Sequence, residues 1–115
     1  MPEEEILYPG SVHNHTDYSN FRLRDSTNTV KTLIDQAIKL GHEVVAITEH
    51  ETIASAIDAE NYYNKIKKDN PNFKVILGNE IYLCRNGLNP RNYDTSQDKW
   101  YHFILLAKDE IGHKQ

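Results

Sequence analysis

The chain of 115 residues has only one cysteine, no long apolar run and no secretory signal, and each of these features excludes a common class of protein. Its single cysteine, Cys84, excludes an internal disulfide and suits a reducing compartment, so we expect a cytoplasmic protein. No apolar run approaches the roughly 20 residues of a transmembrane helix. The acidic start, MPEEEILYPG, does not resemble a secretory signal. These absences predict a protein without membrane contact.

An excess of basic residues is also missing, since 13 Lys and Arg face 17 Asp and Glu for a net charge of −4. This balance argues against a protein that coats nucleic acid, although a local basic groove or a bound metal can override it. Repeats, low-complexity tracts and linkers are absent, and the length allows one domain. The six histidines are the one unusual feature of this composition.

The apolar pattern predicts strands that alternate with helices. We expect strands at residues 10–15, 43–48, 73–77 and 100–107, with 80–84 continuing or pairing with the third, and helices that begin near Val30, Thr52 and Asp109. Helices between buried strands imply parallel strands with right-handed crossovers, which is the α/β class. Because the last helix only begins before the sequence ends, we expect an open sheet or half of a barrel.

Two histidines stand two residues apart in the first expected strand. His13 and His15 would point to the same side, because side chains alternate across a strand. Imidazoles about 7 Å apart along a strand can turn onto one cation. The alternative is a chance pair of surface histidines.

Further candidate ligands follow the other strands. His50 and Glu80 come just after buried strands, where functional groups of α/β folds gather, and His102 lies inside an apolar strand. A carboxylate among apolar neighbours is costly to bury unless something such as a metal offsets its charge. Each histidine could instead be a hydrogen-bonded core residue.

Together, these side chains indicate a metal-dependent hydrolytic site. Histidines mixed with carboxylates, including Asp25 in the loop after His15, favour Zn, Mn or Fe. Neighbouring ions would suit phosphoryl transfer. Arg22 and Arg24 in the same loop could bind a phosphate, or could belong to a solvated loop with Asp25 as partner. The sequence has no Gly-rich phosphate loop, Ser-His-Asp order or CxxC pair that would point elsewhere.

Four segments in order, HNHTDYSNFRLRDS, AITEHE, GNEIYL and WYHFILLAKDEIG, resemble the PHP (polymerase and histidinol phosphatase) domain. These segments are most similar to the PHP domain at the N-terminus of bacterial DNA polymerase III alpha subunits. The similarity runs from about Ser11 to Ile111. The resemblance implies a distorted seven-stranded β/α barrel with helices outside and up to three divalent ions. Residues 1–115 would be the N-terminal part of that domain, with about three β/α units and a further strand.

The resemblance also implies a role for each candidate ligand. His13 and His15 would bind the first ion, Glu80 would bridge the first and second, His102 would bind the second, and His50 and Asp25 would belong to the third. Glu80, His13 and His15 would be the catalytic residues. One departure is Glu49, where the family usually has an Asp before the histidine. The family's later ligands would lie beyond Gln115.

The function that the resemblance implies is that of a DNA polymerase III alpha-like, DNA-directed DNA polymerase acting in replication. Its PHP part would be a metal-dependent phosphoesterase, which performs 3′–5′ proofreading in some polymerases, and its partners would be DNA and the rest of the polymerase. The fragment alone would be weak or inactive. A stand-alone phosphatase of the histidinol-phosphatase kind and a non-catalytic structural module remain alternatives. An uncovered sheet edge predicts self-association.

Overall fold

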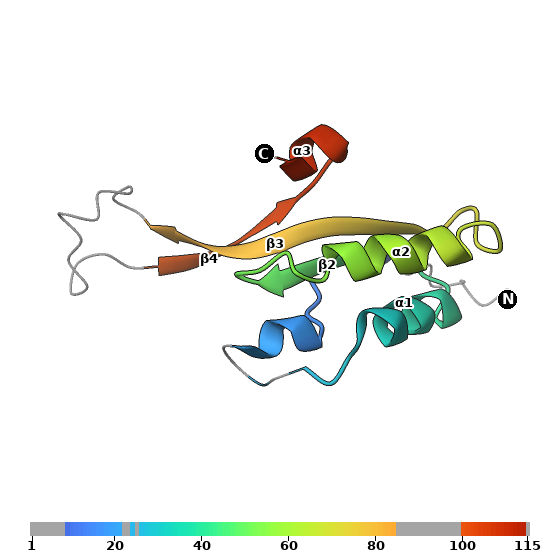
Figure 1. Ribbon diagram of the computed structural model, residues 1–115, viewed down its shortest axis with the longest axis horizontal. Coiled ribbons are helices and arrows are strands. Elements are labelled where there is room, and N and C mark those ends of the chain that lie inside the picture. The colour runs from blue at the N-terminus through green and yellow to red at the C-terminus, as the bar shows by residue number, and fades with distance from the viewer. Residues whose placement is uncertain (1–8, 22–23, 25, 85–99, 115) are drawn as a thin grey trace, which may run out of the picture.

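A computed structural model describes residues 9–21, 24, 26–84 and 100–114, which form an open sheet with helices packed against it (Figure 1). The elements in chain order are β1 (Gly10–Ser11), the 3-10 helix η1 (Asp17–Phe21), α1 (Val30–Lys39), β2 (Val44–His50), α2 (Ala56–Ile66), β3 (Lys74–Cys84), β4 (Trp100–Leu106) and α3 (Glu110–Lys114). The strands lie in the order β1-β2-β3-β4. This mixed α/β half-barrel confirms the predicted fold class.

The first three strands are parallel, as predicted, but the expectation of a parallel fourth strand is wrong. β4 runs antiparallel to β3, with Gly78 opposite Leu106 and Cys84 opposite Trp100. A parallel neighbour needs a crossover connection, usually a helix, whereas an antiparallel neighbour does not. The polar sequence of residues 85–99 offers no apolar helical period for such a crossover.

Several element boundaries also differ from the predictions. β1 ends at Ser11, so the two histidines that follow lie outside the ladder. Residues 80–84 continue the third strand, which is one of the two predicted arrangements, so Glu80 lies inside β3 rather than at its end. α2 begins at Ala56, because Thr52 accepts a hydrogen bond from the Ala54 N–H in a turn before the helix instead of capping it.

The hydrophobic core lies between the two long helices and the sheet. Its buried members are Val30, Ile34, Ala37, Val45, Ile47, Ala59 and Phe73. Thr29 begins α1 with a capping box, in which its side chain accepts from the Thr32 N–H and the Thr32 hydroxyl accepts from the Thr29 N–H. Within the described ranges, no helix has the length and apolar character to cross a membrane.

Candidate metal centre

The pairing of the strands brings the candidate ligands together. His50, the last residue of β2, lies directly opposite Glu80 in the parallel register of β3. In the antiparallel register of β4, His102 lies opposite Tyr82, one diagonal step from Glu80. His13 and His15 approach from the segment between β1 and η1. Residues from three separate parts of the chain therefore converge on the centre of β3.

Asn14 fixes the segment that carries His13 and His15. Its backbone N–H donates to the Thr48 hydroxyl at 3.0 Å, and its carbonyl accepts from the Thr48 N–H at 2.9 Å. Its side-chain amide donates to the Ala46 carbonyl at 2.9 Å. These bonds continue the attachment to β2 after β1 has ended, so the segment is held to the sheet without regular strand pairing.

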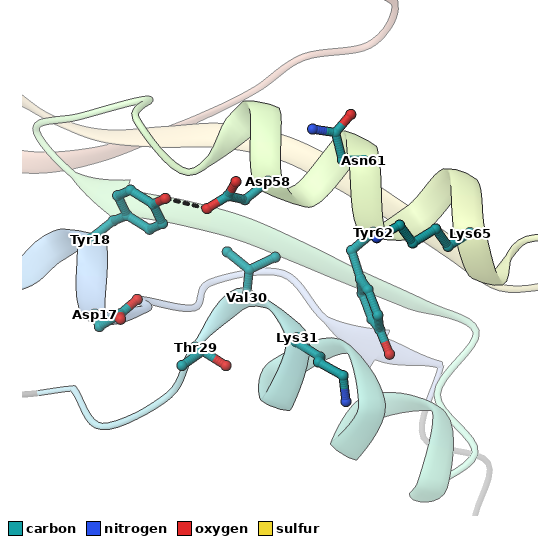
Figure 2. Close-up of a pocket in the computed structure, with 9 residues that line it drawn as sticks. All are labelled: Asp17, Tyr18, Thr29, Val30, Lys31, Asp58, Asn61, Tyr62 and Lys65. Carbon is teal, nitrogen blue, oxygen red and sulfur yellow. Dashed lines mark hydrogen bonds between the residues drawn. The ribbon is translucent and has the colours of Figure 1, made fainter.

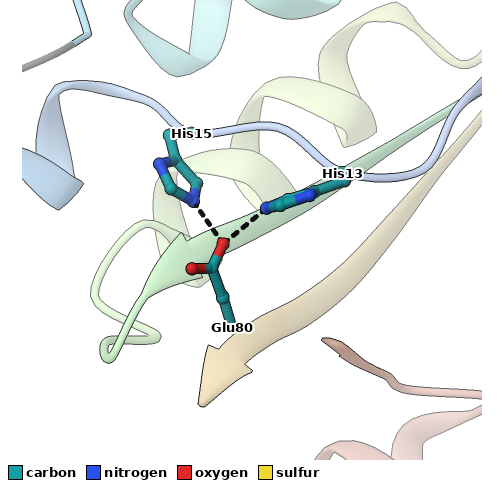
Figure 3. Close-up of side chains that lie close together, drawn as sticks. All are labelled: His13, His15 and Glu80. Carbon is teal, nitrogen blue, oxygen red and sulfur yellow. Dashed lines mark hydrogen bonds and ion pairs between the residues drawn. The ribbon is translucent and has the colours of Figure 1, made fainter. Parts of the chain in front are cut away.

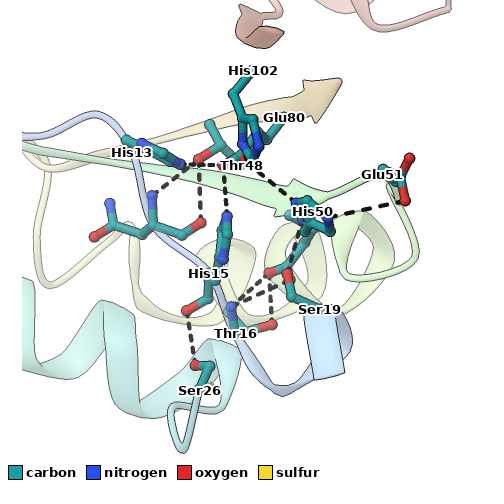
Figure 4. Close-up of polar contacts among 12 residues, drawn as sticks. His13, His15, Thr16, Ser19, Ser26, Thr48, His50, Glu51, Glu80 and His102 are labelled. Carbon is teal, nitrogen blue, oxygen red and sulfur yellow. Dashed lines mark hydrogen bonds and ion pairs between the residues drawn. The ribbon is translucent and has the colours of Figure 1, made fainter. Parts of the chain in front are cut away.

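The two oxygens of Glu80 each contact a different pair of histidines. Oε2 accepts from His13 Nε2 at 2.5 Å and from His15 Nε2 at 2.9 Å, as Figure 3 shows. Oε1 accepts from His50 Nδ1 at 3.2 Å and from His102 Nδ1 (Figure 4). We refer to these five residues as the Glu80 cluster. It contains two sets of three ligands, and within each set the ligand atoms lie within 4.8 Å of one another.

The charge and exposure of the Glu80 cluster suit a ligand site. Burial opposes ionisation of Glu80, but hydrogen bonds from His102, His15, His13 and His50 outweigh it and lower its pKa to about 2. The carboxylate is therefore ionised at neutral pH. Its side chain is only 4% exposed, whereas those of His13 and His102 are 51% and 59% exposed. A buried charge thus lies beneath histidines that solvent can reach.

Glu49, the departure from the family pattern, is a buried anchor beside the Glu80 cluster. It is 1% exposed and accepts from the Thr16 N–H at 3.0 Å, the Thr16 hydroxyl at 2.6 Å and the Ser19 hydroxyl at 2.5 Å. The Ser19 hydroxyl in turn accepts from the His50 N–H at 2.9 Å. The longer side chain therefore links the residue after His15 to the backbone of His50.

Tyr82 is a neighbour of the Glu80 cluster that is not among the predicted site residues. Its hydroxyl bonds to His50 Nε2 at 3.0 Å, and its ring lies edge-on to His102 with centroids 5.0 Å apart. The alternation of side chains in β3 could have found it, because residues two apart in a strand share a face and Tyr82 follows Glu80 by two.

The remaining predicted residues are Arg22, Arg24 and Asp25. Arg22 and Asp25 lie outside the described residues, so the expected grouping of His50 with Asp25 stays a prediction. Arg24 is exposed, and none of the contacts described for the cluster involves it. A shallow hollow of about 360 Å³ next to His13 and His15 is also lined by Asn14, Ser26 and Asn28.

A larger groove of about 690 Å³ lies elsewhere, among η1, α1 and α2 (Figure 2). Tyr18 donates to the Asp58 carboxylate across one end of it. Lys31 and Lys65 also line the groove and add positive charge to the negative charge of Asp58. No member of the Glu80 cluster lines this groove. The cluster, with its converging ligand atoms, is therefore the stronger candidate for chemistry.

Comparison with known proteins gives the family of the chain and a related fold. A family model described as PHP domain matches residues 11–115. A solved structure from Bifidobacterium adolescentis, assigned as a candidate metal-dependent phosphoesterase, superposes with a TM-score of 0.54 and 33% identity, over 69% of this chain and 24% of that one.

Curated relatives are DNA polymerases. "Probable DNA polymerase YorL" of Bacillus subtilis (strain 168) is 46% identical over 107 residues, which are 90% of this chain and 8% of that protein. DNA polymerase III subunit alpha of Treponema pallidum is 31% identical over 103 residues, and that of Helicobacter pylori (strain 26695) is 34% identical over 103 residues, with the same coverage. The chain thus spans less than a tenth of the length of these relatives.

Proposed function

Because the chain belongs to the PHP domain family, we propose that the Glu80 cluster binds two divalent metal ions and hydrolyses phosphate esters. One observation supports this proposal: the two oxygens of a single buried carboxylate each contact a different pair of histidines. A carboxylate can bridge two ions in such an arrangement, and paired ions recur in phosphatases and nucleases.

The donor set fits such ions. Imidazole nitrogens with one carboxylate suit Zn, Mn or Fe better than Mg or Ca, which prefer sites built from oxygen ligands alone. His13 and His15 would hold one ion, His50 and His102 the other, and Glu80 both. Bound ions would supply Lewis-acid activation of water and of phosphate oxygens. The exposed histidines leave the side that faces solvent open to an ester.

The wider role follows from the relatives. We propose that residues 1–115 are the N-terminal part of a PHP domain in a DNA polymerase III alpha-like protein that acts in replication in the cytoplasm. DNA and the rest of the polymerase would be its partners, and 3′–5′ exonuclease activity would be the reaction of the PHP site. Arg22 and Arg24 would contribute phosphate contacts, and Asp25 a ligand for a third ion.

Metal content tests the proposal. Protein purified without chelators should hold at least about one equivalent of Zn, Mn or Fe by elemental analysis. The His13→Ala/His15→Ala double variant removes two of the three ligands on the Glu80 Oε2 side, so it should lose metal. His113→Ala, on exposed α3, is the matched control and should retain the wild-type content. Equal metal in the double variant and the wild type would overturn the proposed site.

We also propose that this chain self-associates through β4. β4 is an edge strand of the described sheet and exposes large apolar side chains, including Phe103 and Leu105. An edge of this kind without charged residues invites pairing with a second copy. Light scattering should show a dimer or larger species at high protein concentration, and a monomer throughout would contradict the proposal.

A further inference from the structure

An aromatic pair extends the face of the sheet that carries the Glu80 cluster. Tyr82 lies two residues beyond Glu80 in β3, and Trp100 lies two residues before His102 in β4. Residues two apart in a strand share a face, so both rings belong to the same side as the cluster. The ring centroids of Tyr82 and Trp100 are 5.3 Å apart, with the rings tilted by 53°.

The two rings differ in how they are held. Tyr82 is half-buried, and its hydroxyl bond to His50 and its edge contacts with the His50 and His102 rings fix its position. Trp100 is 54% exposed although it is the largest apolar side chain of β4. The pair therefore presents aromatic surface to solvent beside a polar ligand cluster, and it lies outside the hydrophobic core.

We propose that Tyr82 and Trp100 form a platform for a nucleobase whose phosphate lies at the Glu80 cluster. Two residues along a strand span about 7 Å, which a single sugar can bridge between a phosphate and its base. Aromatic side chains stack on any base, so such a platform binds without sequence preference. The inference rests on the proposed function and gives the site a contact for the base of its substrate, which is either the end of single-stranded DNA or a free nucleotide.

β4 provides its own control. Tyr101 lies next to Trp100 and is 48% exposed, but the alternation of the strand places it on the opposite face of the sheet. Replacing it removes a similar aromatic surface from the same strand without touching the platform. Trp100→Phe keeps a flat ring at the platform, whereas Trp100→Ala removes it.

Trp100 is the only tryptophan, so its fluorescence reports the platform directly. The 115-residue chain, loaded with Zn²⁺, is titrated with phosphorothioate-linked tetrathymidylate, with thymidine 5′-monophosphate and with glycerol phosphate. Both thymine ligands should quench the fluorescence saturably, and glycerol phosphate should not. Tighter binding of the tetramer would identify a DNA end as the ligand, and equal binding a free nucleotide.

Anisotropy of a labelled tetramer then compares the variants. Trp100→Ala should weaken binding by about tenfold, while Trp100→Phe and Tyr101→Ala should stay within about twofold of the wild type. Absence of thymidylate binding, binding without quenching, or an unchanged affinity in Trp100→Ala would each overturn the platform. Metal content, measured on the same samples, separates this failure from that of the metal site, because loss of metal overturns the proposed function whatever the fluorescence shows.

Discussion

Replacing Glu80 with glutamine is expected to abolish metal binding at both ligand sets at once. Each set contains Glu80, and the two sets share no other residue. Glutamine keeps the size of the side chain but removes its charge and turns one oxygen into an N–H donor, which would face a pair of histidines. Loss of a residue that only orients a ligand costs 10–100-fold in metal affinity. Loss of the shared ligand should therefore cost more than about 100-fold.

The measurement is the metal dissociation constant by competition with a chromophoric chelator. His13→Ala/His15→Ala provides the informative contrast, because it leaves the set of His50, His102 and Glu80 intact. One weakened site is expected there and two in Glu80→Gln. Glu60→Gln, on the exposed side of α2, controls for the loss of one negative charge. A dissociation constant within threefold of the wild type in Glu80→Gln would contradict the role of a shared ligand.

The sequence predicted which side chains converge more reliably than how they are grouped. His13, His15, His50 and Glu80 were predicted from strand ends and alternation, and the structure places all of them together although β1 ends before the two histidines and Glu80 lies inside β3. The position of His102 depends on the direction of β4, which local sequence does not encode. An antiparallel β4 sets His102 opposite Tyr82 and brings it next to His50, with ring centroids 5.8 Å apart. Spacing along the chain cannot show this pairing.

The helices were easier to predict than the segments between strands. The apolar residues of α1 follow a helical period and are buried against β2, so sequence and packing favour the same boundary at Val30. The path of residues 12–16 has no such pattern. This path depends on hydrogen bonds from the side chains of Asn14 and Thr16 to β2, which join residues more than 30 positions apart in the sequence. Long-range polar bonds of this kind have no periodic signature in a sequence.

Glu49→Ala is expected to destabilise the fold and to weaken metal binding together. Glu49 is the acceptor for the Thr16 N–H and for the Thr16 and Ser19 hydroxyls, all in buried residues. A buried donor left without a partner costs about 1–3 kcal/mol. Because hydroxyls can turn toward other acceptors, we expect the free energy of unfolding to fall by about 3 kcal/mol rather than by the full sum. Urea denaturation of metal-free protein measures this loss, and Glu43→Ala, at an exposed position before β2, should change it by less than about 0.5 kcal/mol.

The metal affinity of the same variant separates anchoring of the site from general stability. Glu49 holds the residue after His15 directly and the backbone of His50 through Ser19, so its removal should loosen one ligand in each set. A residue that orients ligands in this way is worth 10–100-fold in affinity. Glu49→Gln retains a carbonyl oxygen that can accept from Thr16, and it should recover part of both losses. If the dissociation constant measured well below the melting temperature were unchanged in Glu49→Ala, Glu49 would stabilise the fold without positioning the ligands.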